Sequence, residues 1–195
     1  MSKADPSASK RERNKTILWV VKIFLITILV SGTISFVSDA IMAASTTVVA
    51  FLILLTIVFV GIIFDIIGVA VTSADEKPFH SMAARKVPGA QESIRLLRNA
   101  ERVSSICNDV VGDICGVISG SASATIAVQI MNHIEFSREK FVTLLMSALV
   151  AGLTVGGKAI GKTFAIHSCT NIVQNVGKLI WGLKNLPKLF RKKKK

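Results

Sequence analysis

The sequence lacks the common catalytic patterns. It contains no G-x-S-x-G, no HExxH and no Walker A motif, and no nucleophile is paired with a candidate base. Residues 157–162, GKAIGK, resemble a phosphate loop, but three residues separate the glycines where a Walker A needs four. They also follow an apolar run where a strand should be. We therefore do not expect an enzyme.

Cysteine is scarce as well. The three cysteines, Cys107, Cys115 and Cys169, are widely spaced and form no CxxC pair. This spacing argues against a disulfide framework and against a zinc site. We expect reduced cysteines that serve as small buried side chains.

Acidic residues are missing from the C-terminal part of the chain. The net charge is +12, and ten of the 24 basic residues lie in residues 158–195, which contain no aspartate or glutamate. A nucleic-acid binder would carry such an excess on a polar domain with aromatic platforms. Here the basic residues adjoin apolar runs, so we expect anionic lipid headgroups as partners and no nucleic acid.

Long apolar runs make up much of the rest. Of the 195 residues, 51% are hydrophobic, and they occur in long blocks, which indicates an integral membrane protein. A helix of about 20 apolar residues crosses a bilayer. The sequence predicts an all-α fold with four transmembrane helices, over residues 16–37, 46–72, 106–131 and 141–157.

The polar segments set the expected topology. Residues 1–15, residues 74–105 and the C-terminal tail hold 5, 6 and 10 basic residues, whereas the turn 38–45 has none and the loop 132–140 has two, offset by two acids. By the positive-inside rule, both termini of this multi-pass protein lie on the cytoplasmic side of the plasma membrane. We expect a disordered tail over 1–15 and an uncleaved first helix, although a basic segment before an apolar run also describes a signal peptide.

Two polar segments have helical periodicity. Residues 74–105 are expected to form a cytoplasmic helical hairpin, with an amphipathic helix at the membrane surface. Residues 165–195 repeat apolar side chains at helical spacing, flanked by Lys178 and Lys184. This pattern predicts a basic amphipathic juxtamembrane helix and tail whose lysines contact lipid headgroups.

Ionisable side chains within the apolar runs are the candidate functional residues. Asp65 is the one charge in the second run, and an ionisable group inside a span marks a functional site unless it merely ends the run at the interface. Asn108 and Asp113 stand at similar depth in the third run. Oxygen donors of this kind suit a partly hydrated Mg²⁺. The predicted metal ligands are therefore Asp65, Asn108 and Asp113.

The third run leaves alternatives open. It is rich in Gly, Ser and Ala, which places it at the centre of a helical bundle. Asp109 and Asp113 are four residues apart and share a helix face. In place of a metal site, Asp109 would lie at the interface and Asp113 would pair with a buried cation, Lys158 or Lys162.

A series of short motifs follows in a familiar order. They are residues 69–73 (VAVTS), 89–90 (GA), 96–97 (LL), 101–105 (ERVSS), 112–113 (GD) and 157–162 (GKAIGK). Over about residues 46–185 the order resembles the transmembrane domain of the CNNM/CorC (CorB) family of magnesium transporters. The resemblance implies a family-like three-span domain over 46–164, with 16–37 as an added helix, and a homodimer that carries Mg²⁺ or Co²⁺.

The family pattern is not matched throughout. Members usually continue into cytoplasmic CBS and CorC-type domains, which this sequence does not contain, so a separate cytoplasmic regulatory protein is a candidate partner. The family has an acidic residue in the turn that follows its last span, and Lys158 stands at that position here. By the resemblance, Lys158 and Lys162 line or plug the vestibule that leads to the ion site. The first hypothesis is divalent-cation transport or efflux. The alternative is a non-transporting membrane adaptor or regulatory protein that keeps the fold and binds anionic lipid or a protein partner.

Overall fold

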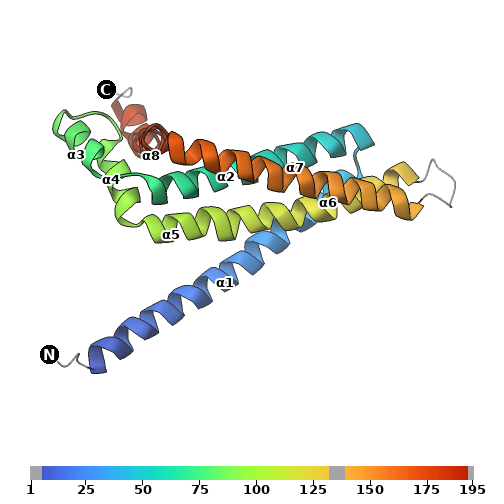
Figure 1. The fold of residues 1–195 in the computed structure, drawn as a ribbon, viewed down its shortest axis with the longest axis horizontal. Helices are drawn as coiled ribbons and strands as arrows, with labels where there is room; N and C mark the ends of the chain where they lie inside the picture. The colour runs from blue at the N-terminus through green and yellow to red at the C-terminus, as the bar shows by residue number, and fades with distance from the viewer. Residues whose placement is uncertain (1–5, 132–138, 193–195) are drawn as a thin grey trace.

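The chain is built from helices (Figure 1). A computed structural model describes residues 6–131 and 139–192, and these contain no strand. In chain order the elements are α1 (Pro6–Ala43), α2 (Thr47–Ser73), α3 (Lys77–Ala84), α4 (Ala90–Arg98), α5 (Ala100–Ser105), the π-helix η1 (Ile106–Gly112), α6 (Asp113–Met131), α7 (Glu139–His167) and α8 (Cys169–Lys192).

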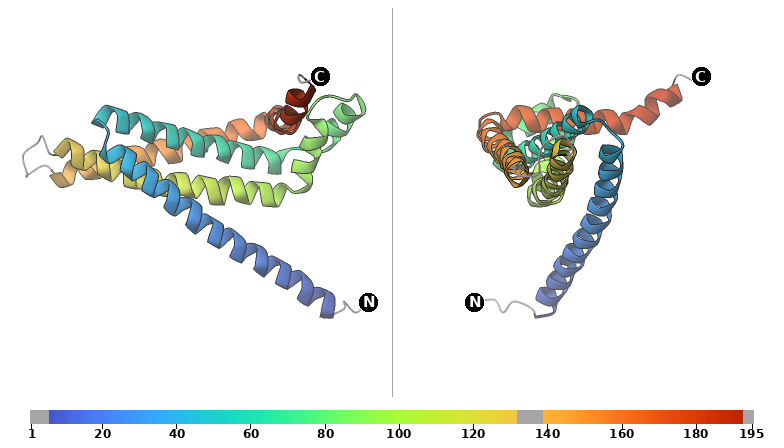
Figure 2. Two further views of the ribbon diagram at one scale, coloured as in Figure 1. Left: turned by 180° about the vertical axis from the view of Figure 1, so that it is seen from behind. Right: turned by 90° about the vertical axis from the view of Figure 1, so that its right-hand side faces the viewer.

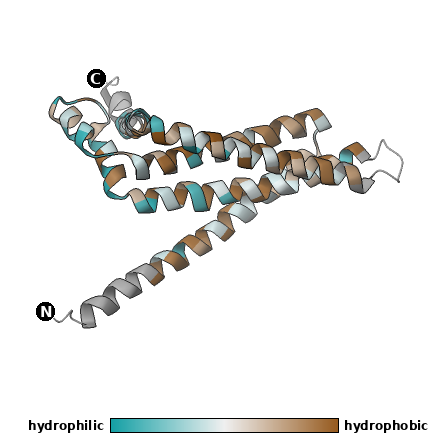
Figure 3. Cartoon of the chain, in the orientation of Figure 1, coloured by the Kyte–Doolittle hydropathy of each residue, from teal (hydrophilic) through white to brown (hydrophobic). Residues whose placement is uncertain are grey.

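Four helical stretches in the described part of the chain are long and apolar enough to cross a membrane. They are Ile17–Met42, Thr47–Ser73, Ala100–Ile130 and Thr143–His167. Apolar residues extend along these stretches, and polar residues gather at the end where α3 and α4 lie (Figure 3). The apolar runs of the sequence therefore predicted the class correctly: this is an all-helical, multi-pass membrane protein.

The body of the fold is a bundle of α2, α6 and α7, which lie side by side (Figures 1 and 2). Leu54, Ile126 and Val150 come from these three helices and are buried together. Gly161 of α7 lies so close to α2 that an added Cβ would stand 2.8 Å from Ile66 Cγ1. Such small residues allow membrane helices to approach closely.

The first helix, α1, packs on the bundle near its C-terminal end. Ser38 and Met42 are buried there, and Gln129 Nε2 donates a hydrogen bond of 3.0 Å to the Met42 carbonyl oxygen. Toward its N-terminus α1 runs away from the bundle (Figures 1 and 2). Its side chains are accordingly open, with Leu29 69% exposed. An exposed apolar helix of this kind suits contact with lipid.

A second core closes the polar end of the bundle, where α8 crosses α4. Phe79 and Val173 are fully buried in it. Gly89, with φ at +85°, precedes α4 and lies against the α8 backbone at Gly177, a contact that leaves no room for a Cβ on either glycine. Ser93 Oγ donates a hydrogen bond of 3.1 Å to the Val173 carbonyl oxygen. These contacts fix α8 across the end of the bundle.

Some boundaries differ from the sequence predictions. Residues 6–15, expected to be disordered, are helical and belong to α1. The fourth span does not end at residue 157, because α7 continues to His167 through the GKAIGK segment. The predicted hairpin over 74–105 consists of the short helices α3, α4 and α5. Residues 132–138, most of the predicted outer loop, lie outside the described residues, as do 1–5 and 193–195.

Candidate functional site

Asp65 lies inside the bundle and forms an ion pair with Lys158. The aspartate is 4% exposed and stands two turns before the end of α2. Lys158 Nζ, from α7, is 3.9 Å from Asp65 Oδ1, and the lysine side chain is 24% exposed. This distance is too long for a hydrogen bond, so the two groups attract each other as charges without a shared proton.

Two buried oxygen atoms near this pair lack a hydrogen-bond partner. Within the described part of the chain, neither Asp65 Oδ2 nor Asn108 Oδ1 accepts a hydrogen bond. An unsatisfied buried acceptor costs about 1–3 kcal/mol of folding free energy, and more for a charged group. Folded proteins satisfy nearly all such groups. Among the described residues, Thr27, Ser38 and Gln129 also carry an unpartnered buried oxygen, but the two described here lie beside a buried charge, which makes this the candidate site.

Asn108 is positioned by the π-helix η1. Its Nδ2 donates a hydrogen bond of 3.2 Å to Ser104 Oγ, and its side-chain amide packs directly on Gly68, one turn beyond Asp65 on α2. One turn beyond Asn108, an added Cβ on Gly112 would stand 3.3 Å from Lys158 Nζ. π-helical turns within helices are frequent at functional sites. Here η1 brings an amide oxygen and a glycine to the same stretch of α2 and α7.

The remaining predicted ligand, Asp113, lies elsewhere, as does its neighbour Asp109. Asp109 and Asp113 are exposed, and Asp109 Oδ2 accepts a hydrogen bond of 2.7 Å from Ser105 Oγ. The pairing suggested for Lys158, with Asp113, is not the observed one, because the lysine lies against Asp65. In the parts of the chain described, no three His, Cys, Asp or Glu side chains are grouped so that they could hold a metal ion. The structure therefore separates exposed Asp113 from buried Asp65 and from half-buried Asn108, whose Oδ1 is enclosed.

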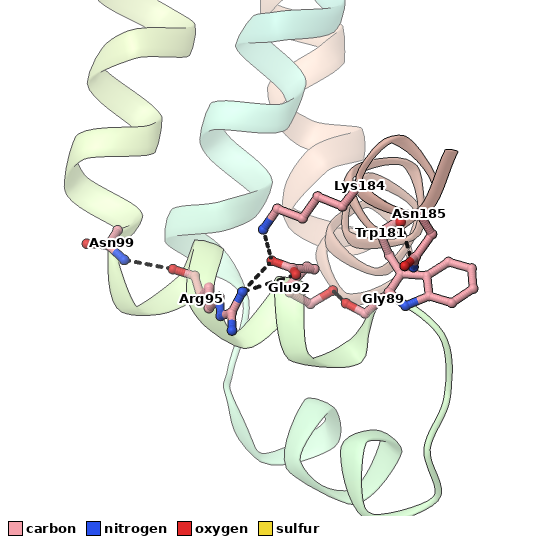
Figure 4. A network of polar contacts seen from close by, with 8 residues as sticks. Gly89, Glu92, Arg95, Asn99, Trp181, Lys184 and Asn185 are labelled. Atoms are coloured by element: carbon pink, nitrogen blue, oxygen red, sulfur yellow. Dashed lines mark hydrogen bonds and ion pairs between the residues drawn. The ribbon is translucent and has the colours of Figure 1, made fainter. Parts of the chain in front are cut away.

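The lysines predicted to meet lipid have different surroundings. Lys178 is exposed, whereas Lys184 Nζ donates a hydrogen bond of 3.0 Å to Glu92 Oε2 (Figure 4). Lys162, which the resemblance placed at the vestibule, is also exposed. Arg95 forms a second ion pair with Glu92 at 3.1 Å. The hydrogen bond from Lys184, with help from Arg95, holds the pKa of Glu92 below its usual range. Lys184 thus ties α8 to α4 in the described structure.

Sequence reasoning identified Asp65, Asn108 and Lys158 but did not predict how they meet. It missed the π-helix and the contact between Asn108 and Gly68. The available signal was the spacing of glycines: Gly68 stands three residues after Asp65, and Gly112 four after Asn108. Each pair lies on one helix face, where a glycine opens space beside a polar side chain.

Comparison with models of protein families, with curated proteins and with solved structures gave no match. The class of protein therefore follows from the chain itself. It is a multi-pass helical membrane protein with a carboxylate and a lysine paired inside its bundle.

Proposed function

We propose that the protein is a membrane cation-transport protein whose ion site is formed by Asp65 and Asn108. The observation that carries this proposal is the pair of buried, unpartnered oxygens, Asp65 Oδ2 and Asn108 Oδ1. Both are hard oxygen donors, and a third polar group, the Lys158 ammonium, lies 3.9 Å from Oδ1, the other oxygen of the Asp65 carboxylate, as a tethered cation. A carboxylate and an amide suit a Mg²⁺ ion that keeps several of its waters. Co²⁺ is a second candidate cargo.

Lys158 has a defined part in this proposal. A divalent ion entering beside Asp65 would repel the ammonium 3.9 Å from Oδ1. The long lysine side chain can withdraw along its flexible stem. Lys158 therefore neutralises Asp65 when no ion is present and gives up the carboxylate when an ion arrives. This exchange avoids leaving an uncompensated charge inside the bundle, which is costly in a membrane.

The setting of the site follows the sequence expectations. The chain begins α1 toward the same end of the bundle at which α8 lies (Figure 1). The basic excess of its tails supports a cytoplasmic position for that end, in a protein of the plasma membrane. The resemblance to CNNM/CorC transporters supports Mg²⁺ as cargo and a homodimer as the working form. Asp65 then stands near the inner leaflet.

A flux measurement tests the proposal. The protein is reconstituted in liposomes, and Mg²⁺ entry is followed with a trapped indicator. Asp65→Asn should abolish the flux, because it removes the charged ligand while keeping the side-chain shape. Asp39→Asn, on the exposed surface of α1, is the matched control and should leave the flux unchanged. Undiminished flux through Asp65→Asn would refute the ligand assignment.

A second function is favoured by the same ion pair. If Lys158 never leaves Asp65, the pair is structural and the protein is a non-transporting membrane adaptor or regulator. Lys158→Met separates the two readings, because methionine fills a similar length without a charge. Transport predicts that Mg²⁺ entry persists and that half-maximal flux moves to lower Mg²⁺. The adaptor reading predicts no flux in either the wild-type protein or the variant.

A further inference from the structure

An apolar groove lies between α1 and the bundle. Its volume is about 370 Å³, within the range of roughly 300–1,000 Å³ that is usual for small-molecule sites. One wall is α1, through Val30 and Ile34; the other consists of α2 and the η1–α6 stretch, including Phe64, Val111 and Ile114. The groove therefore adjoins the helices that carry the cation site but faces the first helix.

The lining of the groove is apolar and suits a hydrocarbon chain. All but one of its residues are apolar or cysteine, and the exception, Thr56, donates its hydroxyl hydrogen to the Leu52 carbonyl oxygen at 2.8 Å. The lining thus offers no free polar side chain to a polar ligand. Water is not expected in it, because apolar cavities of this kind stay dry.

The position of the groove limits where its occupant comes from. The walls belong to three of the stretches long enough to cross a membrane, so the groove lies at the depth of the lipid chains. It sits where α1 diverges from the bundle, and the divergence widens toward the N-terminus of α1 (Figures 1 and 2). Exposed Lys22 lies toward the N-terminal end of α1, eight residues before Val30, or about 12 Å along the helix. A basic side chain there can reach a lipid phosphate at the interface.

We infer that the groove binds one acyl chain of an anionic phospholipid, with the headgroup near Lys22. The hydrocarbon lining selects the chain, and the lysine supplies the complementary charge. The lipid holds α1 in its divergent position by filling the space that α1 leaves open. This inference rests on the membrane placement of the helices and stands whether or not Asp65 binds a cation.

Photolabelling of the full-length protein in nanodiscs tests the inference. The probe is phosphatidylglycerol with a diazirine in its acyl chain, diluted into phosphatidylcholine, and labelled peptides are mapped by mass spectrometry. Labelling of the peptide that contains Val111 and Ile114 should saturate at a low mole fraction of probe. Labelling on the open surface of α7, at Leu144, which is 69% exposed, should rise in proportion to the probe. Proportional labelling at both places would overturn the inference.

Matched variants of α1 sharpen the test. Ile34→Trp fills the groove and should abolish the saturable label, whereas Phe36→Trp, at a position 77% exposed on α1, should retain it. Equal labelling of the two variants would contradict the site. If Ile34→Trp fails to fold, the saturation curve of the wild-type protein still tests whether the groove binds the acyl chain. Lys22→Gln should remove the preference for phosphatidylglycerol over a diazirine phosphatidylcholine; an unchanged preference would refute the assignment of the headgroup.

Discussion

Removal of the Lys158 ammonium should destabilise the bundle through the charge it leaves behind on Asp65. Two unit charges about 4 Å apart attract by about 4 kcal/mol at an effective dielectric constant of about 20. The pair here lies at 3.9 Å, without a hydrogen bond, and Lys158 is 24% exposed. Desolvation and partial screening reduce the gain, so we expect Lys158→Ala to lower the free energy of unfolding by about 2 kcal/mol.

Thermal unfolding of the purified protein in detergent measures this effect. For a chain of this length, about 2 kcal/mol corresponds to a fall in Tm of about 4–8 °C. The control is Lys162→Ala, one turn further along α7 and exposed, which should change the free energy of unfolding by less than about 0.5 kcal/mol. The double variant Lys158→Ala/Asp65→Asn should regain much of the loss, because no charge is then stranded.

Two outcomes would refute this reasoning. An equal Tm for Lys158→Ala and Lys162→Ala would mean that the buried aspartate does not depend on the ammonium. Additive losses in the double variant would mean that Asp65 and Lys158 do not interact energetically, since independent sites add and coupled sites do not.

Two further predictions concern packing and pH. Gly68→Ala should lower the free energy of unfolding by about 1–3 kcal/mol, because its methyl group would collide with the Asn108 amide; Gly152→Ala, where nothing lies within 4 Å, should cause no such loss in a thermal melt. Glu92 has a lowered pKa in the folded protein, chiefly through the hydrogen bond from Lys184. The ionised Glu92 therefore makes its full contribution to the free energy of unfolding above the ordinary pKa of 4.5. This contribution is lost as the pH falls through the lowered pKa of the folded protein. Because Lys184 is 56% exposed, the effect should stay below about 1 kcal/mol, and Glu92→Gln should flatten the dependence of Tm on pH below 4.5; an unchanged dependence would exclude Glu92 as its source.

The membrane spans could be predicted because hydropathy depends on composition alone. The most apolar 18 residues of α2 have a mean hydropathy of 3.0, and no folded context is needed to recognise them. The end of α7 could not be predicted in this way. In the sequence, glycines at 157 and 161 are compatible with a turn or with close packing. The structure shows close packing, because Ile62 and Ile66 of α2 lie against these glycines.

The partner of Lys158 also depended on information that the local sequence does not contain. Regular α-helical spacing puts Asp109 and Asp113 on one face but does not say whether that face points inward. The intervening π-helix changes the register within this stretch, and both aspartates are exposed while Gly112 faces the lysine. Asp65 could be identified as a candidate because a lone charge in an apolar run is conspicuous; its depth and its lysine partner required the packing of α2 against α7.

The central claim is that Asp65 contributes to a cation site, and a Mg²⁺ titration of thermal stability tests it most directly. A ligand that binds only the folded state raises stability by about 2.7 kcal/mol at a concentration 100 times its Kd. We predict a saturable rise in Tm with Mg²⁺ that exceeds the rise with Ca²⁺ or Na⁺ and that disappears in Asp65→Asn. No rise at millimolar Mg²⁺, or the same rise in Asp65→Asn, would contradict the account.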